Sequence, residues 1–321
     1  MISVLGVDVG GTKIAVGPVD RAGTQLAPPV VALSQTSDEE SFLLGLEAVL
    51  RRALKEFERF EPGAIGLACA GTVDRARREV VSSPNLPLVS VALGPTLQEA
   101  LGMPVVLEND GNAAVLGEAL AGAAAGLRNV VLLTLGTGVG GGLFIDGKLY
   151  RGAHGGAGEL GHTVVQMGGI PCRCGNRGCL EMYASGPALA RYASSRARDP
   201  ERDPNGTLIA LRERGELNGG VVSRLAREGH PGAIEAVKQL ADWLGIGLVN
   251  IANTFDPDMI VVGGGVGELG ELLLRPAREF LRRTAMPPGS EEVQVAAAKL
   301  GNRAGLVGAA LATWEVVEGT G

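Results

Sequence analysis

The residues of this chain best suited to chemistry lie close together, between Glu159 and Glu181. One imidazole and three thiols follow one another there: His162, Cys172, Cys174 and Cys179. Four such ligands at close spacing suit tetrahedral zinc, and four protein ligands leave no open coordination position for catalysis. The sequence therefore predicts a structural zinc ion, whose role is to hold Glu159, His162 and Glu181 around another ligand.

The alternatives to a metal are a disulfide or thiols that are buried incidentally. The fourth cysteine, Cys69, lies in an apolar run, and an even set of disulfides would have to join it to the zinc loop. No signal peptide is recognisable that would direct the chain to an oxidising compartment. The ligand types and their spacing together favour the metal.

A second candidate site is a glycine turn that follows a carboxylate. Asp8 ends an apolar run and precedes Gly10, Gly11, Thr12 and Lys13, after which a second apolar run begins. Such a hairpin turn can present backbone N–H groups to phosphate oxygens, and Asp8 could hold Mg²⁺, usually through water. Similar clusters recur at Gly136-Thr137-Gly138 and Gly263-Gly264-Gly265, which strengthens the phosphate interpretation.

Two familiar nucleotide motifs are excluded. The run from Gly136 to Gly141 has the spacing of a dinucleotide fingerprint, but the chain continues as a strand where that motif requires a helix. The phosphate loop GxxxxGK followed by Ser or Thr is absent from the sequence.

The triplet Glu108-Asn109-Asp110 lies where a strand is expected to end and a helix to begin. A carboxylate at this position is held rigidly and faces the crevice at the carboxyl ends of the strands. Alternatively, Asp110 is only the N-cap of the helix. Spacing alone leaves both readings open.

Composition limits the classes of partner. At 321 residues the chain is long enough for two domains. A formal charge of −6 and 3% aromatic residues argue against nucleic acid and favour a small-molecule ligand. No apolar run is long enough to cross a membrane, so we expect a cytoplasmic protein.

Hydrophobic periodicity gives the order of the elements. Strands are expected at 2–9, 64–71, 104–110, 259–267 and 293–298, and a strand, a glycine-rich turn and a returning strand at 129–152. Helices are expected at 38–60, 95–101 and 111–122, from about 187, and at 232–254, 269–283 and 304–317. Ser37 and Glu40 resemble a capping box for the first helix. Residues 83–87 are expected to form a loop, and 196–220 an exposed excursion. Alternation of strands and helices indicates an α/β fold with mainly parallel sheets. The strand, glycine turn and strand at 4–17 recur at 129–152, which suggests a duplicated domain.

These motifs, in this order, resemble those of the ROK sugar kinases over residues 4 to about 310. The cysteine block is the most specific of them. That family has a duplicated actin-like (ribonuclease H-like) ATPase fold with two domains around a cleft, and within it the chain is most similar to the bacterial glucokinases. The resemblance implies a small domain at 1–110, a large domain at 111–300 with the zinc-binding loop at 155–181, and a C-terminal helix at 301–321 that packs back on the small domain.

The resemblance also implies a role for each matching residue. Asp110 is expected to be the general base that accepts the proton of the 6-hydroxyl of glucose while ATP phosphorylates that hydroxyl. Asn85, Asn109, Glu159, His162 and Glu181 are expected to bind the sugar, His162 with one ring nitrogen while the other binds zinc. The residues expected to line the site of the nucleotide and Mg²⁺ are Asp8, Gly10, Gly11, Thr12, Lys13, Thr137, Gly138, Gly264 and Gly265.

Two departures from the family pattern affect substrate choice more than chemistry. The run from Ala70 to Asp74 replaces the usual Pro-Gly-Pro-Val-Asp, and Gly111 replaces the usual alanine. Kinases for N-acetylglucosamine, N-acetylmannosamine or another hexose therefore remain alternatives. A sugar-sensing regulator without kinase activity is disfavoured because a strand is expected from Ile2 and the net charge is acidic. A homodimer or homotetramer is usual in such kinases.

Overall fold

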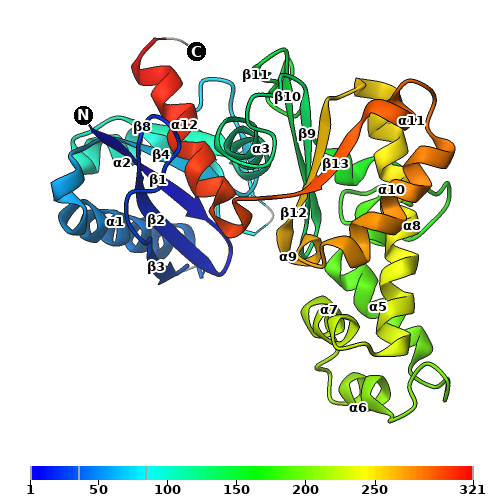
Figure 1. Ribbon diagram of the computed structural model, residues 1–321. Coiled ribbons are helices and arrows are strands. Elements are labelled where there is room, and N and C mark those ends of the chain that lie inside the picture. Colours follow the sequence, from blue (N-terminus) through cyan, green and yellow to red (C-terminus); the bar gives the residue numbers. More distant parts are fainter. Residues whose placement is uncertain (1, 35–36, 84, 320–321) are drawn as a thin grey trace. The chain divides into compact units, whose positions relative to one another are not determined.

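The computed structural model describes residues 2–34, 37–83 and 85–319 (Figure 1). The chain forms two compact units. Unit 1 comprises Met1–Arg128, Gly142–Gly158 and Lys299–Gly321, and unit 2 comprises Asn129–Gly141 and Glu159–Ala298. Among the residues described, no helix combines the length and the apolar character needed to span a membrane.

Unit 1 is built on a five-stranded sheet with the order β3-β2-β1-β4-β8. Its strands are β1 (Ser3–Val9), β2 (Lys13–Val19), β3 (Val30–Leu33), β4 (Pro62–Cys69) and β8 (Val105–Asn109). β1 is antiparallel to β2 and parallel to β4, and β4 is parallel to β8. The predicted hairpin around the first glycine turn is therefore present, beside a parallel half-sheet.

The two faces of this sheet are covered by different helices because strand side chains alternate. On one face, Leu5 and Val7 join a buried cluster with Phe42 of α1 (Glu39–Glu56) and Leu97 of α2 (Leu93–Leu101). On the other face, Gly6 lies under α12 (Ala304–Val317), where an added Cβ would stand 2.1 Å from a helix carbonyl oxygen. Glycine at this strand position lets the C-terminal helix approach the sheet closely.

Unit 2 contains strands of a second five-stranded sheet, whose order is β11-β10-β9-β12-β13. The strands are β9 (Val130–Leu135), β10 (Val139–Ile145), β11 (Lys148–Leu149), β12 (Met259–Gly263) and β13 (Gln294–Ala297). β12 is parallel to both β9 and β13. In both sheets two strands that follow one another across a glycine turn are flanked by later, parallel strands, so the predicted duplicated α/β fold is confirmed.

The helices of unit 2 surround the long helix α8 (Pro231–Phe255), which is coloured yellow in Figure 1. Its neighbours include α5 (Gly186–Arg196), α7 (Gly219–Arg227) and α10 (Glu271–Thr284). The shorter helices of the unit are α4 (Glu181–Ala184), α6 (Thr207–Glu213), α9 (Gly264–Gly267) and α11 (Gly289–Glu292).

Of three local predictions, one was confirmed and two were wrong. The expected loop at 83–87 is confirmed for its described residues, which connect β6 (Val80–Ser82) to β7 (Val89–Val91) in a small antiparallel sheet that also contains β5 (Thr72–Val73). The first helix is capped by Asp38, which accepts a hydrogen bond from the amide of Ser41, and not by Ser37. The expected exposed excursion at 196–220 contains α6, anchored by the buried Leu208, and the start of α7.

The expected domain boundaries also differ from the compact units. Residues 111–128 stay with unit 1 because α3 (Asp110–Ala121) packs against α12, so closely that a Cβ on Gly308 would lie 1.6 Å from the Ala113 carbonyl oxygen. The zinc loop expected at 155–181 is divided after Gly158. Gly155 lies against the backbone of Val73, which keeps the first part of that loop on unit 1.

Candidate functional site

The end of β8 and the start of α3 position the predicted base. Asn109 is the N-cap of α3, because its side-chain oxygen accepts a hydrogen bond from the amide of Asn112 at 3.0 Å. Asp110 is the first residue of the helix and is exposed. Its Oδ1 atom accepts hydrogen bonds from its neighbour Gly111 N at 2.9 Å and from Asn109 Nδ2 at 3.1 Å. The capping role left open for Asp110 therefore belongs to Asn109, and the Asp110 carboxylate is oriented by its neighbours.

The glycine hairpin lies at the same end of the sheet of unit 1. The turn is closed by a hydrogen bond from Gly10 N to Lys13 O at 3.0 Å, and the Ser34 hydroxyl donates to Gly10 O at 2.7 Å. Gly11 lies beside Asn85, where an added Cβ would stand 3.1 Å from the Asn85 carbonyl oxygen. Thr12, Lys13 and Asn85 are all exposed. Unit 1 thus brings together the predicted residues Asp8, Gly10, Gly11, Thr12, Lys13 and Asn85.

Asp8, at the end of β1, has an unusual ionisation. Burial, followed by the negative charge of Asp110, raises the pKa of Asp8 to about 6, while Lys13 opposes the shift. Two carboxylates held near one another resist simultaneous ionisation. A bound cation would relieve this repulsion, which fits the prediction that Asp8 faces Mg²⁺.

We expect Asp8→Asn to stabilise the ligand-free fold at neutral pH. The pKa of Asp8 is about 6 in the folded state and 3.8 ordinarily, so the folded protein binds a proton at Asp8 more tightly than the unfolded chain does. The resulting destabilisation is absent below about pH 4, grows between pH 4 and 6 and is complete above pH 6. In urea denaturation without Mg²⁺ or nucleotide at pH 7.5, the free energy of unfolding of the variant should exceed that of the wild type by on the order of 1–3 kcal/mol.

The matched control is Asp242→Asn on the exposed side of α8. Its free energy of unfolding should stay within about 0.5 kcal/mol of the wild type at every pH. An Asp8→Asn variant that is no more stable than wild type at pH 7.5 contradicts the assigned ionisation.

The predicted metal ligands gather within unit 2. The ligand atoms of His162, Cys172, Cys174 and Cys179 all lie within 4.8 Å of one another. Two separations are 3.6 Å, from Cys172 Sγ to His162 Nδ1 and from Cys174 Sγ to Cys179 Sγ. A tetrahedron with Zn–S bonds of about 2.3 Å has edges of about 3.8 Å, so the donors fit zinc. All four cysteines are free, which leaves no disulfide in this cluster.

Both acidic residues predicted to bind sugar lie beside this cluster. His162 Nε2, the ring nitrogen away from Cys172, is 3.9 Å from Glu159 Oε2. If Nδ1 binds metal, Nε2 carries the proton and acts as a donor. Glu181 begins α4, accepts a hydrogen bond from Val139 N at 3.0 Å, and has its other oxygen 3.8 Å from Cys172 Sγ. Both carboxylates therefore lie next to the cluster of predicted metal ligands.

The predicted glycine turns of unit 2 divide into two groups. Thr137 and Gly265 line a cavity of about 740 Å³. Gly264 adopts a positive φ of 78°, and an added Cβ would stand 2.5 Å from the Leu135 carbonyl oxygen, so a side chain there would be strained. Gly138 instead makes room for Glu181, because an added Cβ would lie 2.4 Å from Glu181 Oε2.

Several residues that line this cavity escaped the sequence analysis. They belong to the segment expected to be an exposed excursion and to the helices that follow it: Leu217, Asn218, Gly219, Gly220, Ser223, Arg227 and Glu268. Asn218 caps α7 by accepting a hydrogen bond from Val221 N at 3.1 Å. The sequence Asn-Gly-Gly before an apolar run was the signal for this helix start.

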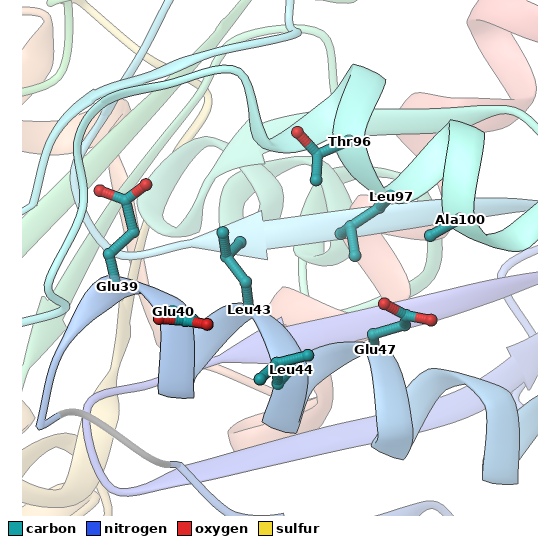
Figure 2. Close-up of a pocket in the computed structure, with 8 residues that line it drawn as sticks. All are labelled: Glu39, Glu40, Leu43, Leu44, Glu47, Thr96, Leu97 and Ala100. Carbon is teal, nitrogen blue, oxygen red and sulfur yellow. The ribbon is translucent and has the colours of Figure 1, made fainter.

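A smaller pocket of about 410 Å³ lies between α1 and α2 (Figure 2). Figure 2 shows carboxylates of α1 at its rim and Leu43 and Leu97 within it. Glu39 and Glu40 stand in the first turn of α1, where acidic residues are stabilised by the helix dipole. Glu47 forms an ion pair with Arg51 at 2.7 Å. Helix stability thus accounts for these charges, and none of the predicted ligand-binding residues lines the pocket.

Comparison with known proteins agrees with this geometry. The model of the ROK family matches residues 4–315. A glucokinase from Streptomyces coelicolor is 42% identical over 314 residues, which cover 95% of this chain and 96% of that protein. A crystal structure of a ROK family glucokinase from Streptomyces griseus, in complex with glucose and AMPPNP, has a TM-score of 0.84 at 41% identity and covers 96% and 98% of the two chains. A xylose repressor from Caldicellulosiruptor bescii is 29% identical over 95% of this chain and 76% of its own length.

The repeated sheet order and the glycine turns at strand ends define an ATPase of the actin-like fold. Within that class the chain belongs to the ROK family. The prediction that it is an enzyme, a sugar kinase, is confirmed by its relatives.

Proposed function

We propose that the protein is a glucokinase that transfers the γ-phosphoryl group of ATP to the 6-hydroxyl of glucose. The observation that carries this proposal is the placement of Asp110. Its carboxylate is exposed at the start of α3 and oriented by hydrogen bonds from Asn109 and Gly111. In phosphoryl transfer a protein mainly positions the acceptor and stabilises charge, and a fixed carboxylate can accept the proton of the hydroxyl.

The remaining sugar hydroxyls are assigned to five side chains. Asn85 and Asn109 of unit 1 offer amide groups that both donate and accept hydrogen bonds. In unit 2, Glu159 and Glu181 offer carboxylate oxygens, and His162 offers Nε2–H. The position of His162 Nε2 beside Glu159 supports this assignment, since both would then contact one ligand.

The nucleotide is assigned to the glycine turns. The hairpin formed by Gly10, Gly11, Thr12 and Lys13 offers backbone N–H groups and one ammonium for phosphate oxygens. The cavity lined by Thr137 and Gly265, at about 740 Å³, is of the usual size for a small-molecule site and suits the nucleoside. Mg²⁺ would be held by Asp8, usually through water, and would neutralise charge on the phosphates when bound.

The zinc ion has a structural role in this proposal. His162, Cys172, Cys174 and Cys179 would fill its coordination sphere and so order the loop that carries Glu159 and Glu181. Free thiols and a nucleotide substrate both favour the cytoplasm as the place where the protein acts. A homodimer or homotetramer remains our expectation for its assembly.

The closest alternative is a kinase for another sugar, N-acetylglucosamine, N-acetylmannosamine or another hexose. In a coupled ADP-release assay with Mg-ATP we expect kcat/KM for glucose to exceed that for mannose, fructose, N-acetylglucosamine and N-acetylmannosamine at least about tenfold. A kcat/KM for an N-acetyl sugar that is larger than the kcat/KM for glucose would show that the N-acetyl sugar is the preferred substrate. If the protein binds a sugar but phosphorylates none, the sugar-sensing regulator is favoured instead. One relative is a xylose repressor.

A further inference from the structure

A buried carboxylate precedes the predicted base, Asp110, by two residues in the sequence. Glu108, the residue before Asn109, is only 2% exposed. A buried charge is stable only when it is paired and hydrogen-bonded. Arg151 supplies the main partner, since its Nε and Nη2 atoms donate to Glu108 Oε2 at 2.9 and 2.7 Å. Arg77 adds a second positive charge at 3.6 Å.

The other oxygen of Glu108 serves the start of α3. Glu108 Oε1 accepts hydrogen bonds from Asn109 N at 3.2 Å and from Asn112 Nδ2 at 3.1 Å. Asn109 in turn donates to Gly71 O at 2.9 Å and to Asp110 Oδ1 at 3.1 Å. A rotation of the Glu108 carboxylate would therefore disturb the residues that orient Asp110.

Arg151 also begins the glycine-rich run that leads to Glu159. The run Arg151–Gly158 ends the second segment of unit 1, and Glu159 begins the second segment of unit 2. Its backbone folds back through a hydrogen bond from Ala157 N to Arg151 O at 3.2 Å. Gly152, Gly155 and Gly158 all have positive φ values, so the run takes a shape that other residues rarely adopt.

We propose that Arg151 is a positioning residue for phosphoryl transfer. Through Glu108 it fixes the orientation of Asp110, and through its own backbone it fixes where the chain leaves unit 1 toward Glu159. This inference rests on the proposed function, in which both carboxylates act on the sugar. Arg151 touches neither the sugar nor the reacting atoms. Its effect is geometric, and small displacements of a reacting group are costly because transfer needs an in-line arrangement.

The test compares Arg151→Met and Arg151→Lys with a matched control, Arg278→Met. Arg278 in unit 2 is as exposed as Arg151, at 25% against 26%, and also forms an ion pair, but with the exposed Glu271 and not with a buried carboxylate. We expect Arg151→Met to lower kcat for glucose about 10- to 100-fold and to raise the glucose KM, with the ATP KM unchanged. Arg151→Lys should recover part of kcat, because lysine keeps the charge without the planar fork. The kcat of Arg278→Met for glucose should stay within about threefold of the wild-type value.

A double variant separates positioning from stability. Arg151→Met leaves Glu108 buried and less well paired, which destabilises the fold, whereas Arg151→Met with Glu108→Gln removes the charge as well. We expect the double variant to regain thermal stability but to keep a low kcat. Recovery of wild-type kcat by the double variant, or a single variant as active as Arg278→Met, would overturn the inference. Failure of the wild type to phosphorylate any sugar would instead overturn the proposed function.

Discussion

Replacing Asp110 by asparagine is expected to lower kcat for glucose about 10²- to 10⁴-fold while glucose still binds. The substitution is nearly isosteric and retains a side-chain oxygen for the bonds from Gly111 N and Asn109 Nδ2. The fold should survive because the N-cap of α3 is Asn109 and not Asp110. The asparagine, however, cannot accept the proton that leaves the 6-hydroxyl.

Steady-state kinetics and calorimetric titration with glucose test this expectation together. The dissociation constant for glucose and the free energy of unfolding should both remain close to those of the wild type. A companion variant, Asn109→Ala, removes the N-cap and should destabilise the protein by about 1 kcal/mol. If Asp110→Asn phosphorylates glucose within tenfold of the wild-type rate, another group is the base.

The parts of the fold that follow from local pattern were predictable. Apolar runs on both sides of a glycine turn predicted the hairpin of β1 and β2 and its repeat in β9 and β10. The same strand order in both sheets follows from that repetition. The gathering of His162, Cys172, Cys174 and Cys179 was predictable because zinc sites depend on residue type and short spacing, which a sequence displays directly.

Features that depend on distant parts of the chain were not predictable in the same way. The boundary of unit 1 lies after Arg128 because α3 packs on α12, an element almost at the other end of the chain. The helix α6 was missed because it is only seven residues long and lies between charged segments that contain proline and glycine. Its start is stabilised by Asp203, whose carboxylate accepts hydrogen bonds from the amides of Leu208 and Ile209 at 3.0 Å. Such a cap is visible only once the loop is folded.

Loss of the metal is expected to have the second large effect. Residues between Thr163 and Arg177 are mostly exposed, so this loop has little apolar surface to hold it in place. Cys172→Ala should reduce bound zinc from about one per chain to a small fraction of that, because three ligands bind far more weakly than four. With the loop released, Glu159 and Glu181 lose their positions, and kcat/KM for glucose should fall by about 10²-fold or more.

The matched control for this variant is Cys69→Ala, which removes a buried thiol from β4 in unit 1. Burial raises the pKa of Cys69 to about 12, so this thiol is neutral and no candidate ligand. Elemental analysis should find about one zinc per chain in Cys69→Ala, and its activity should stay near the wild type. Hydrogen exchange should accelerate within residues 160–181 in Cys172→Ala but not in Cys69→Ala. A fully active wild type that carries no metal would contradict the structural role of zinc, because the positions of Glu159 and Glu181 would then depend on the polypeptide alone.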